Sequence, residues 1–478
     1  MDAPTRKLSL HERYSVMRRN ASFAHPIVLI VTYPSAAAAP TVDFLSQRIT
    51  ELQEHFPLLR SDVMNAKTRE PVFQQRATPY TPDEILRQEQ YVSRGGDRED
   101  KEGLLFHELK RMMGEGTSHP LWQTTLYAAS SANSKSYLTL SVDHVITDGR
   151  GLALLAHALL SSDISSLPME SLQSIPLLED THDIRPSYAH LVPIVLKELV
   201  IPKLPTIIQQ YIKPADKAWP AGYAQAARSP TDCEWDLSLL ELSASLVASL
   251  KSIGKERGVK TLHPLLKVAY LVAMWAVFGR DAASFTLQAD TPRSERNASL
   301  GHAYCTANYT SSVDVHVQPV STDDFWVMAQ RMASELSSPQ GIQKGRYTMG
   351  MLSFIPDPVP DPSKAETDRP TGWEEFFLNK AHSPEPFGGS LQVSNLGYVD
   401  LPPGAEDVAW SQACWPAGPA ICTGVIGHKG GVRVATVWRE GAAVEKAEVK
   451  TVEEVYMRVL CRLVDPSRKG WTLNDLTA

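Results

Sequence analysis

A chain of 478 residues is long for one hydrophobic core, so we expect two domains. Its residues are 43% hydrophobic and 21% charged, which is the composition of an ordinary globular protein. The 47 basic and 54 acidic side chains give a formal net charge of −7 with no block of basic residues, which argues against nucleic acid as the main partner.

Cysteine usage and the N-terminus indicate the compartment. The five cysteines are odd in number, and no two have the Cys-x-x-Cys spacing of a structural zinc site. No cluster of His, Cys and Asp has metal-ligand spacing, so no metal is expected. The first seven residues lack the apolar core of a signal peptide, and the apolar run 27–33 is too short to cross a bilayer. We therefore expect a cytoplasmic protein.

The N-terminal part of the chain predicts alternating helices and strands. Residues 8–20 form a predicted helix whose cap, Ser9, is followed three positions later by Glu12, the pattern of a capping box. A strand is predicted at 26–33 and an amphipathic helix at 41–55.

A hairpin is predicted further along the chain. The polar, charged stretch 82–115 first predicts one or two exposed helices with loops. A strand at about 123–130 then leads through a turn to residues 136–142, where polar and apolar side chains alternate with the period of a half-buried strand. The second strand of this hairpin therefore runs directly into His144.

A turn and a helix follow, and they hold an imidazole close to a carboxylate. Gly149 and Gly151 permit backbone angles or close approaches that other residues do not, and leucines then recur at helical spacing over 152–160. His144 therefore lies at a strand-to-helix corner, with Asp148 four residues on. Histidine is the side chain best suited to take a proton near neutral pH, so His144 is the candidate general base. The alternative is an ordinary turn with a buried, hydrogen-bonded histidine.

The hexapeptide His144-x-x-x-Asp148-Gly149 resembles the signature of the CoA-dependent acyltransferase superfamily, which includes plant BAHD acyltransferases, peptide-synthetase condensation domains and fungal alcohol acetyltransferases. The earlier strand, helix and segment 55–60 (HFPLLR) also look like the opening of this superfamily. The segment 12–14 (ERY) is most similar to the fungal alcohol acetyltransferases, and the plant motif Asp-Phe-Gly-Trp-Gly is absent.

The resemblance implies an α/β fold of two chloramphenicol-acetyltransferase-like domains with a tunnel at their interface. The first domain would span residues 1–225 and the second 226–478, with a crossover at about 162–230. Within the crossover, the apolar segment 192–212 is broken by three prolines. We interpret it as part of the connection, with a lid over the acceptor pocket and a contact with a membrane surface as alternatives.

The second half of the chain again alternates strands and helices. Its patterns predict, in order, a strand near 231–238, helices at 240–257 and 261–279, strands at 284–289 and about 305–314, a hairpin of 420–427 with 432–438, and a closing helix at 451–464.

The resemblance also assigns a structural role to Asp148. In the family, the Asp of the motif faces away from the tunnel and pairs with an arginine, which fixes the turn that aims the histidine. Arg293, which follows the predicted strand 284–289, is the expected partner, with Arg150 or water as alternatives. A buried carboxylate left unpaired would destabilise the fold strongly.

Two further groups of candidate site residues come from the resemblance. Ser394 and Asn395, in a Ser-Asn-x-Gly stretch that several members place near the acyl carbonyl, are candidate oxyanion donors, and one such donor is worth about 3 kcal/mol of barrier. The alternative is a strand end followed by a turn. Tyr304 and Thr306 are candidate pocket residues, because they fall where the family has a strand lining the tunnel.

His263 and Lys267 are candidates to bind the phosphates of CoA. They lie near the N-terminus of the predicted helix 261–279, and a helix N-terminus favours anions. A solvated helix face is the alternative for both side chains.

The resulting prediction is an O-acyltransferase that moves an acyl group, expected to be acetyl, from acyl-CoA to a hydroxyl of a small secondary-metabolite acceptor. His144 would take the hydroxyl proton and return it to the CoA thiolate. Acetyl-CoA is then a co-substrate, no cofactor is tightly bound, and a monomer is expected. Two alternatives stay open: a condensation-type transferase with a carrier-protein-bound acyl donor, and a non-catalytic ligand-binding protein. Asp143 argues against the peptide-forming branch, whose members usually have a second His there.

Overall fold

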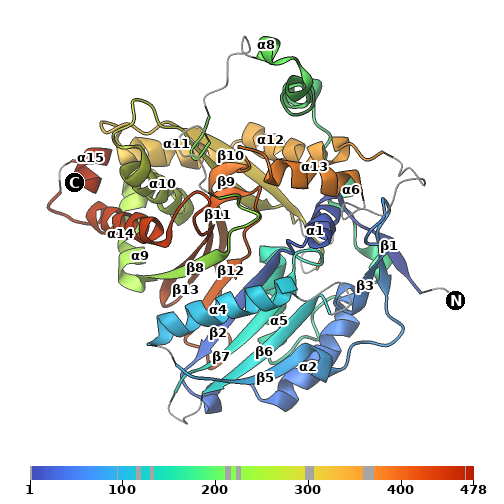
Figure 1. The fold of residues 1–478 in the computed structure, drawn as a ribbon. Helices are drawn as coiled ribbons and strands as arrows, with labels where there is room; N and C mark the ends of the chain where they lie inside the picture. The colour runs from blue at the N-terminus through green and yellow to red at the C-terminus, as the bar shows by residue number, and fades with distance from the viewer. Residues whose placement is uncertain are drawn as a thin grey trace.

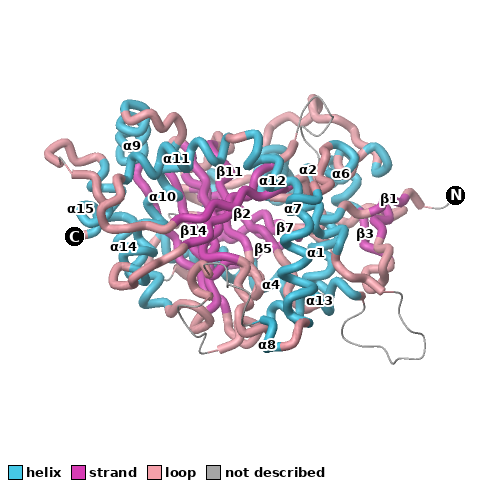
Figure 2. The backbone as a smooth tube through the Cα atoms, turned by 90° about the horizontal axis from the view of Figure 1, so that it is seen from above, coloured by secondary structure: helices cyan, strands magenta, loops and turns pink. Residues whose placement is uncertain are grey.

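The computed structural model is a two-lobed α/β molecule with one large sheet in each lobe (Figure 1). It describes residues 3–93, 95–114, 120–129, 134–209, 217–221, 228–296, 306–358, 371–468 and 470–478. Seen from above, the strands run through the centre of the molecule and helices cover the outside (Figure 2). The predicted fold class is therefore confirmed.

The N-terminal lobe is built on a five-stranded sheet in the order β12-β2-β7-β6-β5. Its elements are β2 (Pro26–Tyr33), β5 (Leu86–Tyr91), β6 (Trp122–Ala129), β7 (Ser136–Asp143), β12 (Asp407–Gln412), α2 (Val42–His55), α4 (Asp97–Gly114) and α5 (Gly149–Leu160). Helices α2 and α5 pack on one face and α4 on the other, so successive residues of β2 enter two cores, Ile27 one and Val28 the other. The predicted hairpin of β6 and β7 is confirmed as an antiparallel pair.

The C-terminal lobe is built on a six-stranded sheet in the order β10-β9-β11-β13-β14-β8. Its elements are β8 (Trp235–Ser243), β9 (Leu287–Ser294), β10 (Thr310–Val317), β11 (Gly389–Tyr398), β13 (Pro419–His428), β14 (Gly431–Arg439), α9 (Ala244–Glu256), α10 (Leu262–Met274), α11 (Phe325–Ser337), α12 (Pro339–Gly350), α14 (Lys446–Leu463) and α15 (Leu473–Thr477). The segment Leu262–Gly279 is long and apolar enough to cross a membrane, but 72% of it is buried, as in the core helix of a globular lobe.

Smaller elements complete the fold. They are β1 (Thr5–Lys7), β3 (Ser61–Met64), β4 (Val72–Gln75), α1 (Leu10–Asn20), α3 (Pro82–Ile85), α6 (Leu178–Thr181), α7 (Tyr188–Val195), α8 (Thr206–Gln209) and α13 (Gly372–Ala381). Helix α1 lies where the lobes meet and packs against α13 (Figure 1). Its predicted capping box is confirmed: Ser9 Oγ accepts from Glu12 N at 3.3 Å, and the Glu12 carboxylate accepts from Ser9 N at 2.6 Å.

The predicted boundary between the strand near 231–238 and the helix 240–257 is wrong. Strand β8 continues to Ser243, and α9 begins at Ala244. The apolar residues before it fit either structure locally, but Leu242 pairs with Val432 of β14. Tertiary pairing therefore decides where the strand ends.

The stretch 82–115 is also not the exposed region that was predicted. Helix α4 lies between the two sheets, where Leu105 and Leu109 are buried against residues of both β2 and β8. Its polar composition concealed this position, because one narrow apolar face is enough to bury a helix.

A buried lysine of α4 links the lobes electrostatically. The Lys101 ammonium forms ion pairs with Asp407, with Glu241 at 2.6 Å and with Asp97 at 3.1 Å. These three carboxylates lie close enough together to hold a metal ion, but the ammonium group contacts all three. The Lys101 ammonium therefore already occupies the position between the carboxylates that an ion would take.

Strand β12 crosses from the second half of the chain into the N-terminal sheet. It runs antiparallel to β2, with Ala409 opposite Ile30. One sheet thus contains strands from both halves, and the division into 1–225 and 226–478 stays a prediction.

The segment 188–208 forms an arm that projects from the molecule (Figure 1). Its exposed large apolar side chains are Tyr188, Val192, Leu196, Val200, Ile207 and Ile208. The inner side of the arm, with Ile194 and Leu199, lines an apolar pocket of about 170 Å³ against Phe376 and Phe377 of α13. The connection, lid and membrane interpretations of the arm stay predictions.

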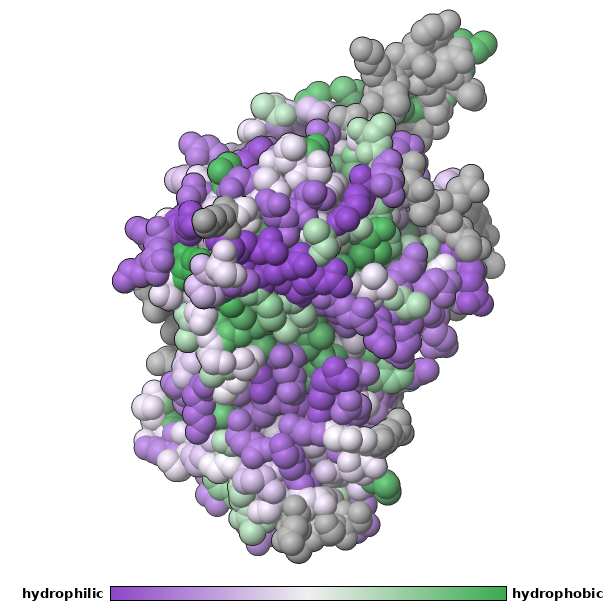
Figure 3. Space-filling model, turned by 90° about the vertical axis from the view of Figure 1, so that its left-hand side faces the viewer, coloured by the Kyte–Doolittle hydropathy of each residue, from purple (hydrophilic) through white to green (hydrophobic). Residues whose placement is uncertain are grey.

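Elsewhere, one face of the molecule is mostly hydrophilic, with apolar side chains gathered across its middle (Figure 3).

Candidate active site

The turn after β7 places Asp148 at the start of α5. Asp148 is the N-cap of this helix, and its Oδ1 accepts a hydrogen bond from Gly151 N at 3.0 Å. Its Oδ2 accepts from the backbone N of Tyr309, which immediately precedes β10, at 2.9 Å. The carboxylate therefore holds the turn and also joins it to the C-terminal lobe.

Arg296 completes the coordination of Asp148. Its Nη1 pairs with both carboxylate oxygens and lies 2.5 Å from Oδ2. Its Nη2 donates to the carbonyl of Ala307 at 3.1 Å, and Ala307 forms a β-bridge with Thr147. Burial by itself would raise the pKa of Asp148, but the Arg296 guanidinium and the backbone donors hold that pKa below its ordinary value. The pair therefore stays ionised at neutral pH.

The prediction that Arg293 pairs with Asp148 is wrong. Arg293 lies on β9, its side chain is 40% exposed, and its Nε is 3.2 Å from Glu295 Oε1. Strand β9 ends at Ser294, and Arg296 lies in the irregular segment beyond it, from which it reaches the motif turn. The sequence gives the spacing of the arginines but not the end of the strand, so it could not choose between them.

Two motif glycines are required by close packing. A Cβ on Gly149 would lie 2.7 Å from the Cδ2 atom of Leu396, which belongs to β11. A Cβ on Gly151 would lie 1.9 Å from Thr147 Oγ1. Glycine at these positions therefore lets the end of β11 and the motif turn lie against α5.

His144 is held by an asparagine of the C-terminal lobe. Asn308 Nδ2 lies 3.0 Å from the carbonyl oxygen of His144 and 2.8 Å from its Nδ1. Because a carbonyl oxygen only accepts, the amide nitrogen faces the ring, and Nδ1 accepts the second amide hydrogen. The neutral ring then carries its proton on Nε2, which has no hydrogen-bond partner in the part of the chain that the structure describes. The ring is 8% exposed.

Two other imidazoles lie beside this ring. The centroid of His144 is 5.7 Å from that of His11 on α1 and 5.4 Å from that of His25, which precedes β2. Burial and the charge of Arg18 lower the pKa of His144 to about 4, and burial lowers the pKa of His11 and of His25 well below the ordinary value. All three rings are therefore neutral at neutral pH.

Both carboxylate oxygens of Asp143, the residue before His144, already have partners. Its Oδ2 pairs with Arg19, and its Oδ1 accepts from Val145 N at 2.8 Å. Its role is therefore to fix the start of the turn.

The Ser394–Asn395 stretch is brought to the motif turn by the packing of the next residue, Leu396, on Gly149. Ser394 is buried, and the Oδ1 of Asn395 accepts from Gly397 N at 2.8 Å. Gly397 has a φ of +80°, so a turn does follow this strand. The oxyanion role of Ser394 and Asn395 stays a prediction.

Lys267 is neither the phosphate ligand nor the solvated lysine that the sequence suggested. It is fully buried, and its Nζ donates to the carbonyl of Ala289 at 3.0 Å and to Thr291 Oγ1 at 2.8 Å. Burial lowers its pKa to about 8. His263 Nε2 lies 3.3 Å from the same Thr291 Oγ1, and burial lowers the pKa of His263 to about 3. Both side chains are therefore directed into the lobe.

Of the two predicted pocket residues, Tyr304 lies outside the described residues. Thr306 is fully buried, its Oγ1 has no hydrogen-bond partner among the described residues, and its carbonyl accepts from Arg296 Nη2 at 3.4 Å. It therefore lies beside the motif turn, and its role in a pocket stays a prediction.

A chain of polar side chains leads from the site into the C-terminal lobe. His25 bonds to Gln412, Gln412 donates to Gln392, and Gln392 Nε2 donates to Asp290 Oδ2 at 2.8 Å. Burial and the nearby carboxylate of Asp314 raise the pKa of Asp290 to about 6. Polar side chains therefore connect His25, beside His144, to Asp290 on β9 of the C-terminal lobe.

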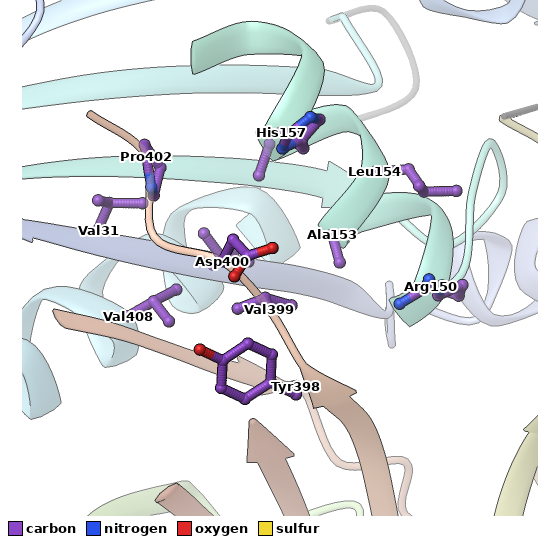
Figure 4. Close-up of a pocket in the computed structure, with 12 residues that line it drawn as sticks. Val31, Arg150, Ala153, Leu154, His157, Tyr398, Val399, Asp400, Pro402 and Val408 are labelled. Carbon is purple, nitrogen blue, oxygen red and sulfur yellow. The ribbon is translucent and has the colours of Figure 1, made fainter. Parts of the chain in front are cut away.

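A pocket of about 200 Å³ lies between α5 and the segment that follows β11 (Figure 4). Arg150 and His157 of α5 line one side of it, and Tyr398 and Asp400 the other. The pocket does not include His144, so the predicted tunnel to that ring stays a prediction.

Sequence reasoning missed five residues around His144 and Asp148: His11, Arg18, His25, Arg296 and Asn308. Only Arg296 left a signal, because it is the next arginine after Arg293. The others belong to segments whose local pattern indicates only a helix, a strand start or a loop.

No family model and no curated protein matched the sequence. Solved structures do match along nearly the whole chain. The condensation domain of the monacolin K polyketide synthase MokA is 10% identical, with 97% of this chain and 98% of that one covered and a TM-score of 0.62. The epimerization domain of the third module of tyrocidine synthetase B is 12% identical, with 97% of each chain covered and a TM-score of 0.59.

Polyketide synthase associated protein 5 from Mycobacterium tuberculosis is 13% identical, with 96% of this chain and 100% of that one covered and a TM-score of 0.57. At these identities the likeness establishes the fold, which is the two-lobed, chloramphenicol-acetyltransferase-like architecture of condensation domains. The resemblance to fungal alcohol acetyltransferases gains no support from these matches.

Proposed function

We propose that this protein is an acyltransferase that moves an acyl group from a thioester to a hydroxyl or amine acceptor, with the thioester carried on the phosphopantetheine arm of a carrier protein. One observation carries the proposal. His144 lies on a turn that Asp148 and Arg296 fix, and its Nε2 has no hydrogen-bond partner among the described residues. Two of the similar structures are domains of tyrocidine synthetase B and of a polyketide synthase, which supports the carrier-bound donor over acyl-CoA.

The proposed step uses a single ring nitrogen. The acceptor atom bonds to the thioester carbonyl carbon, the carbon–sulfur bond breaks, and the acceptor proton ends on the departing thiol. Because Asn308 donates to Nδ1, Nε2 begins protonated, so in one concerted step the ring passes this proton to the departing sulfur while the acceptor proton replaces it on Nε2. This concerted step differs from the base-first order that the sequence suggested. A positioned proton-transfer group of this kind contributes about 10²–10⁴-fold to the rate.

Acyl-CoA as the donor is the second candidate, and Asp143 favours it. The residue before His144 is a carboxylate in an ion pair with Arg19, where peptide-forming members of the superfamily usually have a second histidine. Because CoA and a carrier protein present the same phosphopantetheine thiol, the site chemistry is shared, and only the presentation of the donor differs.

The test is to offer the same acyl group on an acylated carrier protein and on CoA, with a panel of alcohols and amines, and to follow the released thiol. We expect turnover with the carrier-bound donor and a loss of about 10²–10⁴-fold in His144→Ala with the fold retained. His107→Ala is the matched control, because its side chain on α4 is 55% exposed.

The other outcomes decide between the alternatives. Turnover with acyl-CoA alone would identify the second candidate. Turnover that survives in His144→Ala would contradict the role of the ring. Silence with both donors, alongside binding of either, would indicate a non-catalytic protein.

A further inference from the structure

Helix α1 and the residues before it carry four arginines, and three of them have a carboxylate partner. Arg6 pairs with Glu12 at 2.9 Å, Arg13 pairs with Asp357, and Arg19 pairs with Asp143. The fourth, Arg18, forms no ion pair with any residue in the part of the chain that the structure describes. Arg18 therefore differs from its neighbour Arg19, whose guanidinium has a carboxylate partner.

Arg18 is nevertheless buried. The residue is only 5% exposed, and its guanidinium lies 4.5 Å from the centroid of the Tyr14 ring. Nη2 donates to Ser15 Oγ at 3.1 Å, and Nε has no hydrogen-bond partner. A guanidinium keeps its charge in proteins, and a buried charge without a counter-charge destabilises the fold. Packing alone does not explain an arginine at this position.

The surroundings of Arg18 include His144 but, in the part of the chain that the structure describes, no carboxylate that is free of another partner. Arg18 lies seven residues after His11 on the same face of α1, and the His11 ring centroid is 5.7 Å from that of His144. In keeping with this placement, the Arg18 charge lowers the pKa of His144, His11 and His25. The charge of Asp143 also acts on Arg18, but this carboxylate is already engaged by Arg19. An unused guanidinium N–H group therefore lies close to the His144 ring.

We propose that Arg18 binds a carboxylate group of the substrate next to His144. The fork of guanidinium N–H groups matches the two oxygens of a carboxylate. That the bound carboxylate belongs to a substrate rests on the proposed acyl transfer. The carboxylate site itself does not, because the free protein would bind a carboxylate without any reaction. The carboxylate can belong to the acyl group or to the acceptor.

The first experiment needs no acyl donor. The melting temperature of the full chain is measured against butyrate and against butyramide, its uncharged isostere, at constant ionic strength. We expect butyrate at ten times its dissociation constant to raise the melting temperature by about 1–3 °C and butyramide to leave it unchanged. Arg18→Met should lose the butyrate response, with at least a tenfold weaker affinity.

Arg13→Met is the matched control, since it removes a positive charge from the same helix but one that has its own carboxylate. It should keep the butyrate response. Equal responses to butyrate and butyramide, or a butyrate response retained in Arg18→Met, would overturn the proposal. Arg18→Lys keeps the charge and should retain part of the response, which covers the case in which Arg18→Met does not fold.

The second experiment identifies which substrate bears the group. Succinyl and butyryl donors are compared with a neutral acceptor, and a hydroxy acid is compared with the corresponding alcohol with a neutral donor. A preference of tenfold or more for the charged member of one pair, lost in Arg18→Met, assigns the carboxylate to the acyl group or to the acceptor. An equal loss with every pair in Arg18→Met would contradict carboxylate recognition. If no donor is turned over while butyrate binding persists, the proposed function fails and the carboxylate site stands.

Discussion

Two buried groups of charges in this protein differ in how completely they are compensated. Between the sheets, the Lys101 ammonium meets the carboxylate of Asp407, which also pairs with Arg433 at 3.0 Å. Near His144, the Arg18 guanidinium lies over the neutral ring of Tyr14 and, among the described residues, pairs with no carboxylate. Because a buried charge is tolerated when it is paired, the first group joins the lobes, whereas the second leaves donors available to a ligand.

The same difference is visible in the protonation of the groups. Burial by itself would raise the pKa of Asp407, but His428, Lys101 and Arg433 hold it well below its ordinary value. Burial and the single charge of Arg18 both lower the pKa of His144. Charges in the first group therefore reinforce each other's ionisation, whereas in the second burial, helped by the charge of Arg18, keeps the His144 ring neutral.

Removing Lys101 should have the largest effect on stability. Lys101→Met leaves the buried carboxylates without their shared cation, and we expect a loss of about 3–5 kcal/mol in the free energy of unfolding, measured by urea denaturation. Lys110→Met is the control, because its pair with Glu234 is exposed and worth less than about 1 kcal/mol. Similar losses in the two variants would contradict the comparison.

The Asp148–Arg296 pair should show strong coupling. Asp148→Asn and Arg296→Met each leave a buried group without its partner, so the double variant should lose less stability than the sum of the single variants. We expect a coupling energy of up to about 3 kcal/mol from a double-mutant cycle of urea denaturation. The cycle with Arg293 in place of Arg296 should give a coupling near zero, since Arg293 pairs with Glu295.

Removing Arg18 should affect stability much less than its burial suggests. Arg18→Met replaces an uncompensated cation by an apolar side chain, so we expect a change within about 1 kcal/mol or a gain in the free energy of unfolding. A loss of about 3 kcal/mol or more would mean that Arg18 holds the structure together, and the two groups of charges would then be alike.

The smallest expected effect is on the pH profile. Turnover needs neutral His144, so it should hold above a pH of about 4 and fall as the pH decreases through that value. Arg18→Met removes a charge that opposes protonation of the ring, so the acid limb of kcat should move to higher pH. The other titratable groups that face the ring are Asp143, Asp148, His11 and His25. An unmoved acid limb would mean that Arg18 does not act on His144.

Much of the fold could be predicted where one segment contains its own signal. The capping box at Ser9, strand β2 and the hairpin of β6 with β7 follow from periodicity and capping over a few residues. Helix α4 was misplaced because its partners, β2 and β8, are far apart in the sequence. The end of β8 was misplaced for the same reason, since β14 extends the strand.

The sequence by itself determined the strand, turn and helix that carry His144 and Asp148, because glycine spacing and an N-cap act over a few neighbouring residues. Only the tertiary structure decided that Arg296, 148 residues away, meets Asp148 and that Asn308 holds the ring of His144. It also decided that Arg18 lies buried without a carboxylate. Such contacts depend on where the lobes bring distant side chains together, and no local pattern encodes that meeting.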